Sequence, residues 1–289
     1  MKIEERIRQV DLAMEAATVS MRGLTPAESG ATLAATPAEL ASSADVTITI
    51  LTDADAIAAV YDGPDGLLAG EVADKLMIDM STVRPYVAKA LGEKVRAKGA
   101  AFVDCPVGGT VGPARQGKLL GMAGGAGQDF ERAKPLLDQL CRRVDHVGAV
   151  GAGTAMKLAI NLPLAIAFQA LGEAYILCRD IGLDPTIAME IFAESSGGPN
   201  VLKNRGPAIA QVLAGGPSQT AAVPIDLMRK DVATMLEEAK SKGADLPLTS
   251  VVLAVYEQAV KAGWGDRDSS AVPAFWPSCQ PSDKVRPTQ

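Results

Sequence analysis

The chain changes character at the stretch Gly151-Ala152-Gly153-Thr154-Ala155-Met156-Lys157-Leu158-Ala159-Ile160-Asn161. Before this stretch, apolar runs rich in β-branched residues alternate with helical patterns, which predicts an α/β domain over residues 1–150. From the stretch to about Gly263, nearly every segment has helical periodicity, which predicts an all-helical domain over residues 151–289. A length of 289 residues is enough for two domains.

Lys157 and Asn161 stand out within this stretch because they are polar residues in a largely apolar helical pattern. They are four residues apart, so both side chains project from the same face of the helix. Burial and the positive end of the helix dipole near Gly153 both disfavour the charged form of a lysine at this place. Such a lysine could exchange protons near neutral pH. The alternative is a lysine whose ammonium group reaches solvent from a surface helix.

The composition is typical of a globular protein, because 48% of the residues are apolar and 21% are charged. A net charge of −6, without a cluster of lysine and arginine, argues against binding to nucleic acid. No run reaches the ~18 consecutive apolar residues expected of a membrane span. Residues 1–19 are charged and lack the apolar core of a signal peptide. We therefore expect a cytoplasmic protein that binds neither nucleic acid nor a membrane.

Disulfide and metal chemistry are both disfavoured. Cys105, Cys141, Cys178 and Cys279 show no C-x-x-C spacing, so we expect free thiols that are buried as small apolar side chains. His146 is the only histidine, which excludes His-based triads and two-histidine metal sites. We interpret His146 as structural and predict no metal site. Acid–base chemistry would then fall to Lys, Asp, Glu or Tyr.

The α/β part contains four apolar runs that predict strands, at residues 46–51, 76–80, 101–105 and 119–123. Helical patterns follow at residues 53–60, 85–98 and 129–140. This alternation predicts a parallel sheet covered by helices on both faces, with ligands bound where the strands end. In the helical part, breaks are expected at residues 182–185, 197–199 and 215–217, and the tail after Val272 is expected to be loosely ordered.

Five separated motifs, which lie between about Gly30 and Val272, resemble those of one enzyme family. They are Asp79-Met80-Ser81-Thr82, Asp104-Cys105-Pro106-Val107-Gly108-Gly109, Gly151-x-Gly153-x-x-x-Lys157-x-x-x-Asn161, Leu227-Met228-Arg229-Lys230-Asp231 and Asp268-x-Ser270-Ala271. The chain resembles the β-hydroxyacid dehydrogenases, which include 3-hydroxyisobutyrate dehydrogenases and tartronate semialdehyde reductases. The resemblance implies a Rossmann-like domain followed by an all-α domain. It also implies hydride transfer between NAD or NADP and a small β-hydroxy acid or its oxo acid or semialdehyde.

The resemblance also implies roles for single residues. Lys157 would exchange a proton with the substrate oxygen or hydrogen-bond the developing alkoxide, and Asn161 would hold the same oxygen or the substrate carboxylate. Thr82 would contact the nicotinamide or its ribose; the alternative is a helix cap. Lys230 would pair with the cofactor or with the negative end of the substrate; the alternative is a solvated surface charge.

Two further segments receive roles from the resemblance. Leu51 and Thr52, after the first predicted strand, would line the cofactor. The substrate would lie against Pro106, Val107, Gly108, Gly109 and Thr110. Backbone N–H groups near Gly109 could face a carboxylate there. The family usually has Ser-Gly-Gly after Pro-Val, whereas this chain has Gly108-Gly109-Thr110, which affects the identity of the substrate more than the type of reaction. Asp104, before this segment, could also be a turn former.

The sequence departs from the family at its beginning. No G-x-G-x-x-G loop occurs, and residues 1–30 contain glycine only at Gly23 and Gly30. Such a loop supplies the backbone N–H groups that bind a pyrophosphate. Residues 17–22 could be a remnant of the second strand, which would place Arg22 near the adenosine ribose and favour NADP over NAD.

These observations leave different classes of function open. The first is a working NAD(P)-dependent dehydrogenase or reductase. The second is a non-catalytic or N-terminally truncated relative that keeps its helical domain as an oligomerisation module. An imine reductase is disfavoured because Lys157 matches the hydroxyacid enzymes. The resemblance also implies a homodimer or homotetramer with a small-molecule substrate.

Overall fold

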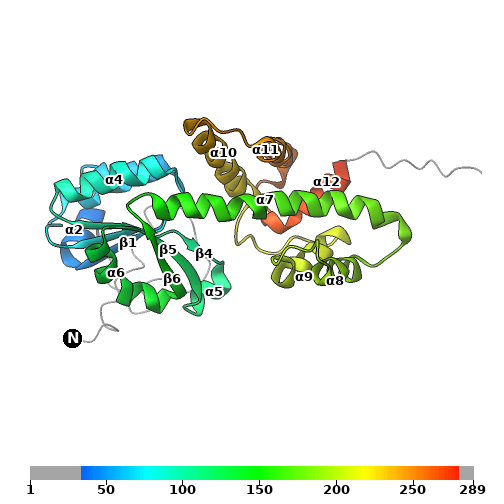
Figure 1. Ribbon diagram of the computed structural model, residues 1–289, viewed down its shortest axis with the longest axis horizontal. Helices are drawn as coiled ribbons and strands as arrows, with labels where there is room; N and C mark the ends of the chain where they lie inside the picture. The colour runs from blue at the N-terminus through cyan, green and yellow to red at the C-terminus, as the bar shows by residue number, and fades with distance from the viewer. Residues whose placement is uncertain (1–33, 280–289) are drawn as a thin grey trace, which may run out of the picture. The chain divides into compact units, whose positions relative to one another are not determined.

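A computed structural model of the protein describes residues 34–279. The chain divides into two compact units, one that ends at Leu158 and one that begins at Ala159 (Figure 1). Helix α7 (Ala152–Cys178) contributes residues to both units. The predicted Arg22 lies outside the described residues.

The first unit is built from short strands and helices. Its elements are α2 (Pro37–Ser43), β1 (Val46–Thr49), α3 (Ala54–Asp62), the 3-10 turn η4 (Leu67–Ala69), β2 (Leu76–Asp79), α4 (Pro85–Ala97), β3 (Ala101–Asp104), β4 (Val107–Gly108), α5 (Val111–Arg115), β5 (Leu119–Gly125), α6 (Gly127–Leu140) and β6 (Cys141–Gly148). Local signals set several helix starts. The Asp53 side chain accepts a hydrogen bond from Ala56 N at the start of α3, and Pro85 occupies the first turn of α4.

The sheet has the order β1-β2-β3-β5-β4, and β6 pairs with the free side of β5. Strands β1, β2 and β3 are parallel, as predicted, but β5 runs antiparallel to β3 and β4, and β6 is parallel to β5. The predicted parallel sheet is therefore confirmed for β1, β2 and β3, whereas the reversal of direction at β5 was not predicted. The chain turns back from β3 to β5 through the short β4 and α5, whereas a parallel connection usually takes a full crossover helix.

Strand β6 was not among the four predicted strands. Most of its residues are exposed or half-buried, so its sequence does not show the continuous apolar run of a central strand. His146 lies on β6, where its Nε2 atom is 3.0 Å from the Gly125 carbonyl oxygen and its ring stacks on Phe130. These contacts support a structural role for His146.

Helices cover both faces of the sheet in this unit. Met77 and Phe102 pack toward α3 and α4, whereas Ile78 and Val103 pack toward α6. Neighbouring residues of one strand point to opposite faces, so a run that is apolar at every position requires cover on both sides. The core therefore follows from the apolar strand sequences.

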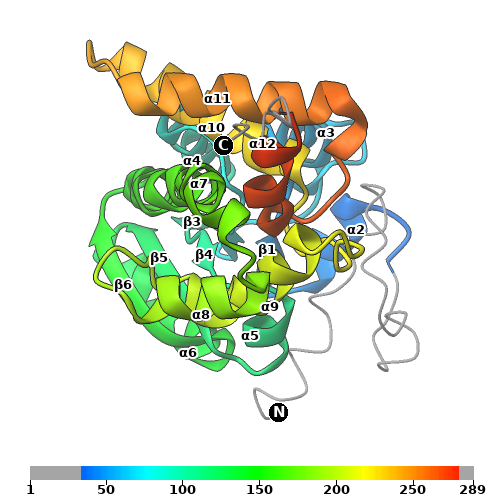
Figure 2. The same ribbon diagram turned by 90° about the vertical axis from the view of Figure 1, so that its right-hand side faces the viewer.

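The second unit is helical. After α7 it contains the 3-10 turn η5 (Arg179–Ile181), α8 (Pro185–Glu194), α9 (Leu202–Leu213), α10 (Ile225–Ser241), α11 (Pro247–Ala259), the π-helical turn η6 (Val260–Trp264), the 3-10 turn η7 (Ser269–Ala271) and α12 (Val272–Cys279). Helix α8 lies beside α9, and α10 beside α11 (Figure 2). The helices end at the predicted breaks; for example, Gly182 adopts a φ of 74°.

Two expectations, one about the tail after Val272 and one about the burial of the cysteines, are corrected by the structure. Residues 272–279 are not loosely ordered but form α12, because Val272 and Phe275 are buried in the apolar core of the helical unit. The four cysteines are free thiols, and Cys105 and Cys141 are buried. Cys178 is only partly buried and Cys279 is exposed, so burial does not describe all four.

Helix α7 with its 3-10 extension, Ala152–Ile181, is long and apolar enough to cross a membrane by length and composition, with a mean hydropathy of 1.4. The criterion of consecutive apolar residues misses this helix because Asn161, Gln169 and Glu173 interrupt its sequence. Core helices of globular proteins also pass this length and hydropathy test, so a single such helix is weak evidence for a membrane span.

Candidate functional site

The parallel strands end together at one edge of the sheet. Thr49, Asp79 and Asp104 are the last residues of β1, β2 and β3, they are paired in register, and all three are buried. The segments that follow contain Leu51 and Thr52 after β1, Thr82 after β2, and Pro106 after β3. The sheet thus brings these four predicted site residues to a common edge, where ligands bind in open α/β sheets.

Asp79 links two of these segments through its side chain. Its Oδ1 atom accepts hydrogen bonds from Thr49 Oγ1 at 2.8 Å and from Ser81 Oγ at 2.7 Å. Ser81 Oγ in turn accepts a bond from Leu51 N at 2.8 Å. Burial raises the pKa of Asp79 to about 6, although the bonds from Ser81 and Thr49 work in the opposite direction.

Asp104 holds the start of the helix that carries Lys157. Its Oδ1 atom accepts a bond from Gly151 N at 2.7 Å, and its Oδ2 atom accepts one from Thr154 N at 2.9 Å. Burial raises the pKa of Asp104 to about 6, and these two N–H bonds oppose that rise. Asp104 therefore accepts hydrogen bonds from backbone N–H groups at the start of α7. These N–H groups have no acceptor within the helix itself.

Two glycines make this junction possible. A Cβ atom on Gly153 would lie 2.3 Å from the Met122 carbonyl oxygen and 2.7 Å from the Asp104 carbonyl oxygen. A Cβ atom on Gly124 would lie 2.5 Å from Asp104 Oδ1. The second glycine of the Gly151-x-Gly153 motif therefore lets the helix approach the ends of β3 and β5 closely.

Lys157 is half-buried and lies one turn beyond Thr154, whereas Asn161 is buried. In the helical unit, Asn161 Nδ2 lies 3.3 Å from Asp231 Oδ2. Lys230 Nζ lies 2.8 Å from the other carboxylate oxygen of Asp231, with which it forms an ion pair. The structure therefore brings Asn161 and Lys230 together on the two oxygens of Asp231.

Sequence reasoning gave no role to Asp231, Asp79 or Ser81. All three were present in the quoted motifs, so the signal was available in their positions. Their function depends on contacts with residues far away along the chain, which no local pattern reveals.

The predicted substrate segment forms a strand and a turn. Val107 and Gly108 form β4, which pairs with β5, and Pro106 before them is buried. Gly109 adopts a φ of 130°, and a Cβ atom there would lie 2.8 Å from Leu119 Cδ2. Thr110 precedes α5 but makes no capping hydrogen bond with its side chain. The conformation of Gly109 thus requires glycine.

The motif at Asp268 connects separate segments of the helical unit. Asp268 Oδ1 lies 2.8 Å from Arg205 Nη1 and accepts a bond from Ser270 N, while Oδ2 accepts one from Ala222 N. The carboxylate is fully buried. These contacts give Asp268 a structural role, because its carboxylate joins three segments of the helical unit.

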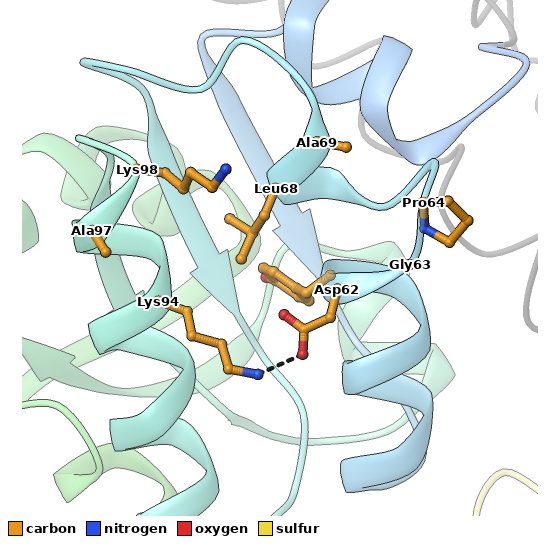
Figure 3. Close-up of a pocket in the computed structure, with 9 residues that line it drawn as sticks. Asp62, Gly63, Pro64, Leu68, Ala69, Lys94, Ala97 and Lys98 are labelled. Carbon is orange, nitrogen blue, oxygen red and sulfur yellow. Dashed lines mark hydrogen bonds and ion pairs between the residues drawn. The ribbon is translucent and has the colours of Figure 1, made fainter.

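A cavity of about 470 Å³ lies elsewhere, where α3 and α4 end (Figure 3). It is lined by Asp62, Gly63, Lys94 and Lys98 among others, and an ion pair joins Asp62 to Lys94. Helices α3 and α4 begin at the carboxyl ends of the strands, so their last residues lie toward the opposite edge of the sheet. None of the predicted site residues lines this cavity.

The donor set at the carboxyl edge fits part of a nicotinamide dinucleotide. The hydroxyl groups of Thr52 and Thr82 and the backbone of the two turns are chemically suited to a ribose and an amide, although the Thr52 hydroxyl donates to Asp53 Oδ2 at 3.2 Å in this structure. Residues 34–158 contain no G-x-G-x-x-G loop to bind the pyrophosphate. Across residues 34–279, no group of three or more His, Cys, Asp or Glu side chains could hold a metal ion.

Comparisons with known proteins give a consistent result. A family profile described as the NAD binding domain of 6-phosphogluconate dehydrogenase matches residues 10–148. A second, described as NAD-binding of NADP-dependent 3-hydroxyisobutyrate dehydrogenase, matches residues 151–276.

Named relatives agree with these profiles. The chain is 36% identical to 3-sulfolactaldehyde reductase of Escherichia coli, over 85% of this chain and 81% of the relative. It is 35% identical to mitochondrial 3-hydroxyisobutyrate dehydrogenase of Mus musculus, over 85% and 74%. The crystal structure of 3-hydroxyisobutyrate dehydrogenase from Salmonella typhimurium has a TM-score of 0.75 and 27% identity, and the match covers 86% of this chain and 85% of that one.

Proposed function

Since the chain belongs to the 3-hydroxyisobutyrate dehydrogenase-like family of NAD(P)-dependent hydroxyacid oxidoreductases, we propose that Lys157 is its catalytic acid–base residue. A bound nicotinamide supplies or takes up the hydride. Lys157 would give a proton to the substrate oxygen in the direction of reduction and remove it in the direction of oxidation. Its ammonium group would also stabilise negative charge that develops on that oxygen.

The observation that carries this proposal is the pair of hydrogen bonds that the Asp104 carboxylate accepts from Gly151 N and Thr154 N at the start of α7. Asp104 ends β3, and the substrate segment begins two residues later at Pro106. Its contacts with Gly151 N and Thr154 N fix the helix turn directly before Lys157. One carboxylate therefore fixes both the lysine helix and the strand that leads to the substrate segment. Catalysis by orientation needs such rigid placement.

We propose that Asn161 and Lys230 serve the same reaction. Asn161 would hold the substrate oxygen or carboxylate, and Lys230 would pair with the cofactor or with the negative end of the substrate. Asp231 supports both roles, because it contacts the amide of one and the ammonium group of the other. Asp231 would thereby keep the two side chains in fixed positions.

The substrate would be a small β-hydroxy acid or its oxo acid or semialdehyde, held against residues 106–110. Backbone N–H groups at the Gly109 turn suit an anionic end group. Thr110 could replace the usual serine hydroxyl of the family. Leu51, Thr52 and Thr82 would contact the cofactor at the ends of β1 and β2.

We also propose a homodimer or homotetramer. Large apolar side chains are exposed on the helical unit, and two of them, Leu177 and Leu248, are 88% and 67% exposed. Burying such residues against another copy is favourable. A cytoplasmic location, without nucleic acid or membrane as partner, agrees with the free thiols and the net charge of −6.

The first test is a titration of the purified protein with NADPH and with NADH, followed by the fluorescence of the nucleotide. Micromolar binding of either nucleotide is expected. Binding would then justify assays with 3-hydroxyisobutyrate and 3-sulfolactaldehyde under the preferred nucleotide. A folded protein that binds neither nucleotide would contradict the proposed cofactor site.

A further inference from the structure

Two chains of hydrogen bonds end on a single atom, Asp79 Oδ1. In one chain, Leu51 N donates to Ser81 Oγ, and Ser81 Oγ donates to Asp79. In the other, Tyr61 lies 2.8 Å from Thr49 Oγ1, which donates to Asp79. The one hydroxyl hydrogen of Thr49 is used on Asp79, so Tyr61 must be the donor to Thr49. All donors therefore point toward the carboxylate.

Of these two chains, it is the Ser81 chain that connects the turn after β1 with the turn after β2. The backbone ladder between these strands ends where Met80 N donates to Thr49 O at 2.7 Å. Beyond it, the Ser81 hydroxyl takes the place of a backbone acceptor for Leu51 N. The side chain thus continues the pairing of the two strands by one more bond.

The residues on either side of this bond are those assigned to the cofactor. Leu51 is followed by Thr52, and Ser81 is followed by Thr82. Leu51, Ser81 and Asp79 are all buried, so water cannot readily replace a lost bond. By contrast, the Thr49–Tyr61 chain runs from β1 to α3 and reaches neither turn.

We propose that Ser81, held by Asp79, is a positioning residue for the cofactor: it sets the spacing between the Leu51–Thr52 turn and Thr82. This inference rests on the proposed binding of a nicotinamide nucleotide at these turns. Ser81 itself touches no nucleotide in this scheme; its hydroxyl is engaged within the protein by Leu51 and Asp79.

Thr49 provides a matched control. Ser81→Ala and Thr49→Val each remove one buried hydroxyl that donates to Asp79 Oδ1, at 2.7 and 2.8 Å respectively. The two variants should therefore lose similar stability in urea unfolding. Each variant also leaves one donor without its acceptor: the Tyr61 hydroxyl in Thr49→Val and Leu51 N in Ser81→Ala. Only the loss at Leu51 frees the turn after β1.

The experiment is fluorescence titration of the full chain and both variants with NADPH and NADH. Ser81→Ala should weaken the binding of the preferred nucleotide about tenfold or more. This loss of affinity corresponds to the free energy of one buried hydrogen bond. The Kd of Thr49→Val for the nucleotide should stay within about twofold of the wild-type value. Ser81→Cys keeps a weak donor and acceptor in place, so its affinity for the nucleotide should lie between those of Ser81→Ala and Thr49→Val.

Several results would overturn the inference. One is wild-type affinity in Ser81→Ala, and another is an equal loss of affinity in Thr49→Val. If Ser81→Ala does not fold, Ser81→Cys decides, and unchanged affinity in that variant is contrary evidence. A folded wild type that binds neither nucleotide would refute the proposed function together with this inference, whereas a binding wild type with unaffected variants would refute the inference alone.

Discussion

Asp104 Oδ1 lies 2.7 Å from Gly151 N, so a buried carboxylate at the end of β3 holds the first turn of α7. This contact connects residues 47 positions apart and involves the first glycine of the motif that leads to Lys157. Together with the bond from Thr154 N, it makes the position of the lysine helix depend on one side chain.

Asp104→Asn should lower kcat at least tenfold. An asparagine keeps one acceptor oxygen, but its amide nitrogen faces either Gly151 N or Thr154 N and repels that donor. We expect a loss of stability of roughly 1–3 kcal/mol from the unmet N–H group. Steady-state kinetics and urea unfolding measure the two effects. Asp138→Asn, which changes an exposed carboxylate, is the control, and equal kcat values for both variants would show that the contact does not affect catalysis.

Gly153→Ala should destabilise the protein, although alanine usually stabilises a helix relative to glycine by about 0.5–1 kcal/mol. The new Cβ atom would lie 2.3 Å from the Met122 carbonyl oxygen, so the start of α7 must move away from β5. Gly127→Ala at the start of α6 is the matched control, because a Cβ atom there has nothing within 4 Å apart from its chain neighbours and its own helix backbone. Thermal unfolding should show a lower Tm for the first variant and an unchanged or higher Tm for the second. The reverse order would contradict the close approach.

Asp79→Asn should change how stability depends on pH. Burial raises the pKa of Asp79 from 3.8 to about 6, so between these values the native state binds more protons than the unfolded state. Wild-type stability attributable to this group is therefore full at low pH and decreases as pH rises through about 6. Relative to Asp79→Asn, the wild type should lose about 1 kcal/mol between pH 5 and pH 7. Urea unfolding at both pH values measures this, and parallel changes in the two proteins would contradict a raised pKa.

Lys157→Ala should abolish most turnover and leave the fold intact. Removing a general acid–base residue costs about 10²–10⁴-fold in rate. Met156→Ala, at a side chain 45% exposed on the same turn of α7, should keep wild-type activity. Steady-state assays with the preferred nucleotide, checked by circular dichroism, compare the two variants. Substantial activity in Lys157→Ala would remove this lysine from the proposed mechanism.

Much of the fold was predictable from local patterns. Continuous apolar runs predicted β1, β2, β3 and β5, and helical periodicity and glycine breaks predicted most helices, because burial on two faces or on one stripe leaves a direct trace in the sequence. The reversal of direction at β5 left no such trace. Strand direction depends on how the connection after β3 folds, and an exposed edge strand such as β6 needs few apolar residues.

For the candidate site, the sequence by itself determined the chemistry: a lysine and an amide on one helix face, hydroxyl residues after two strands, and a glycine turn. Tertiary structure decided the arrangement. The bonds Leu51–Ser81, Asp104–Gly151 and Asn161–Asp231 join residues 30, 47 and 70 positions apart. A hydrogen bond requires a donor–acceptor distance correct to within a few tenths of an ångström and a nearly straight angle. Periodicity, by contrast, reports only which residues are buried. Only the packed sheet and helices bring these donors and acceptors within bonding distance.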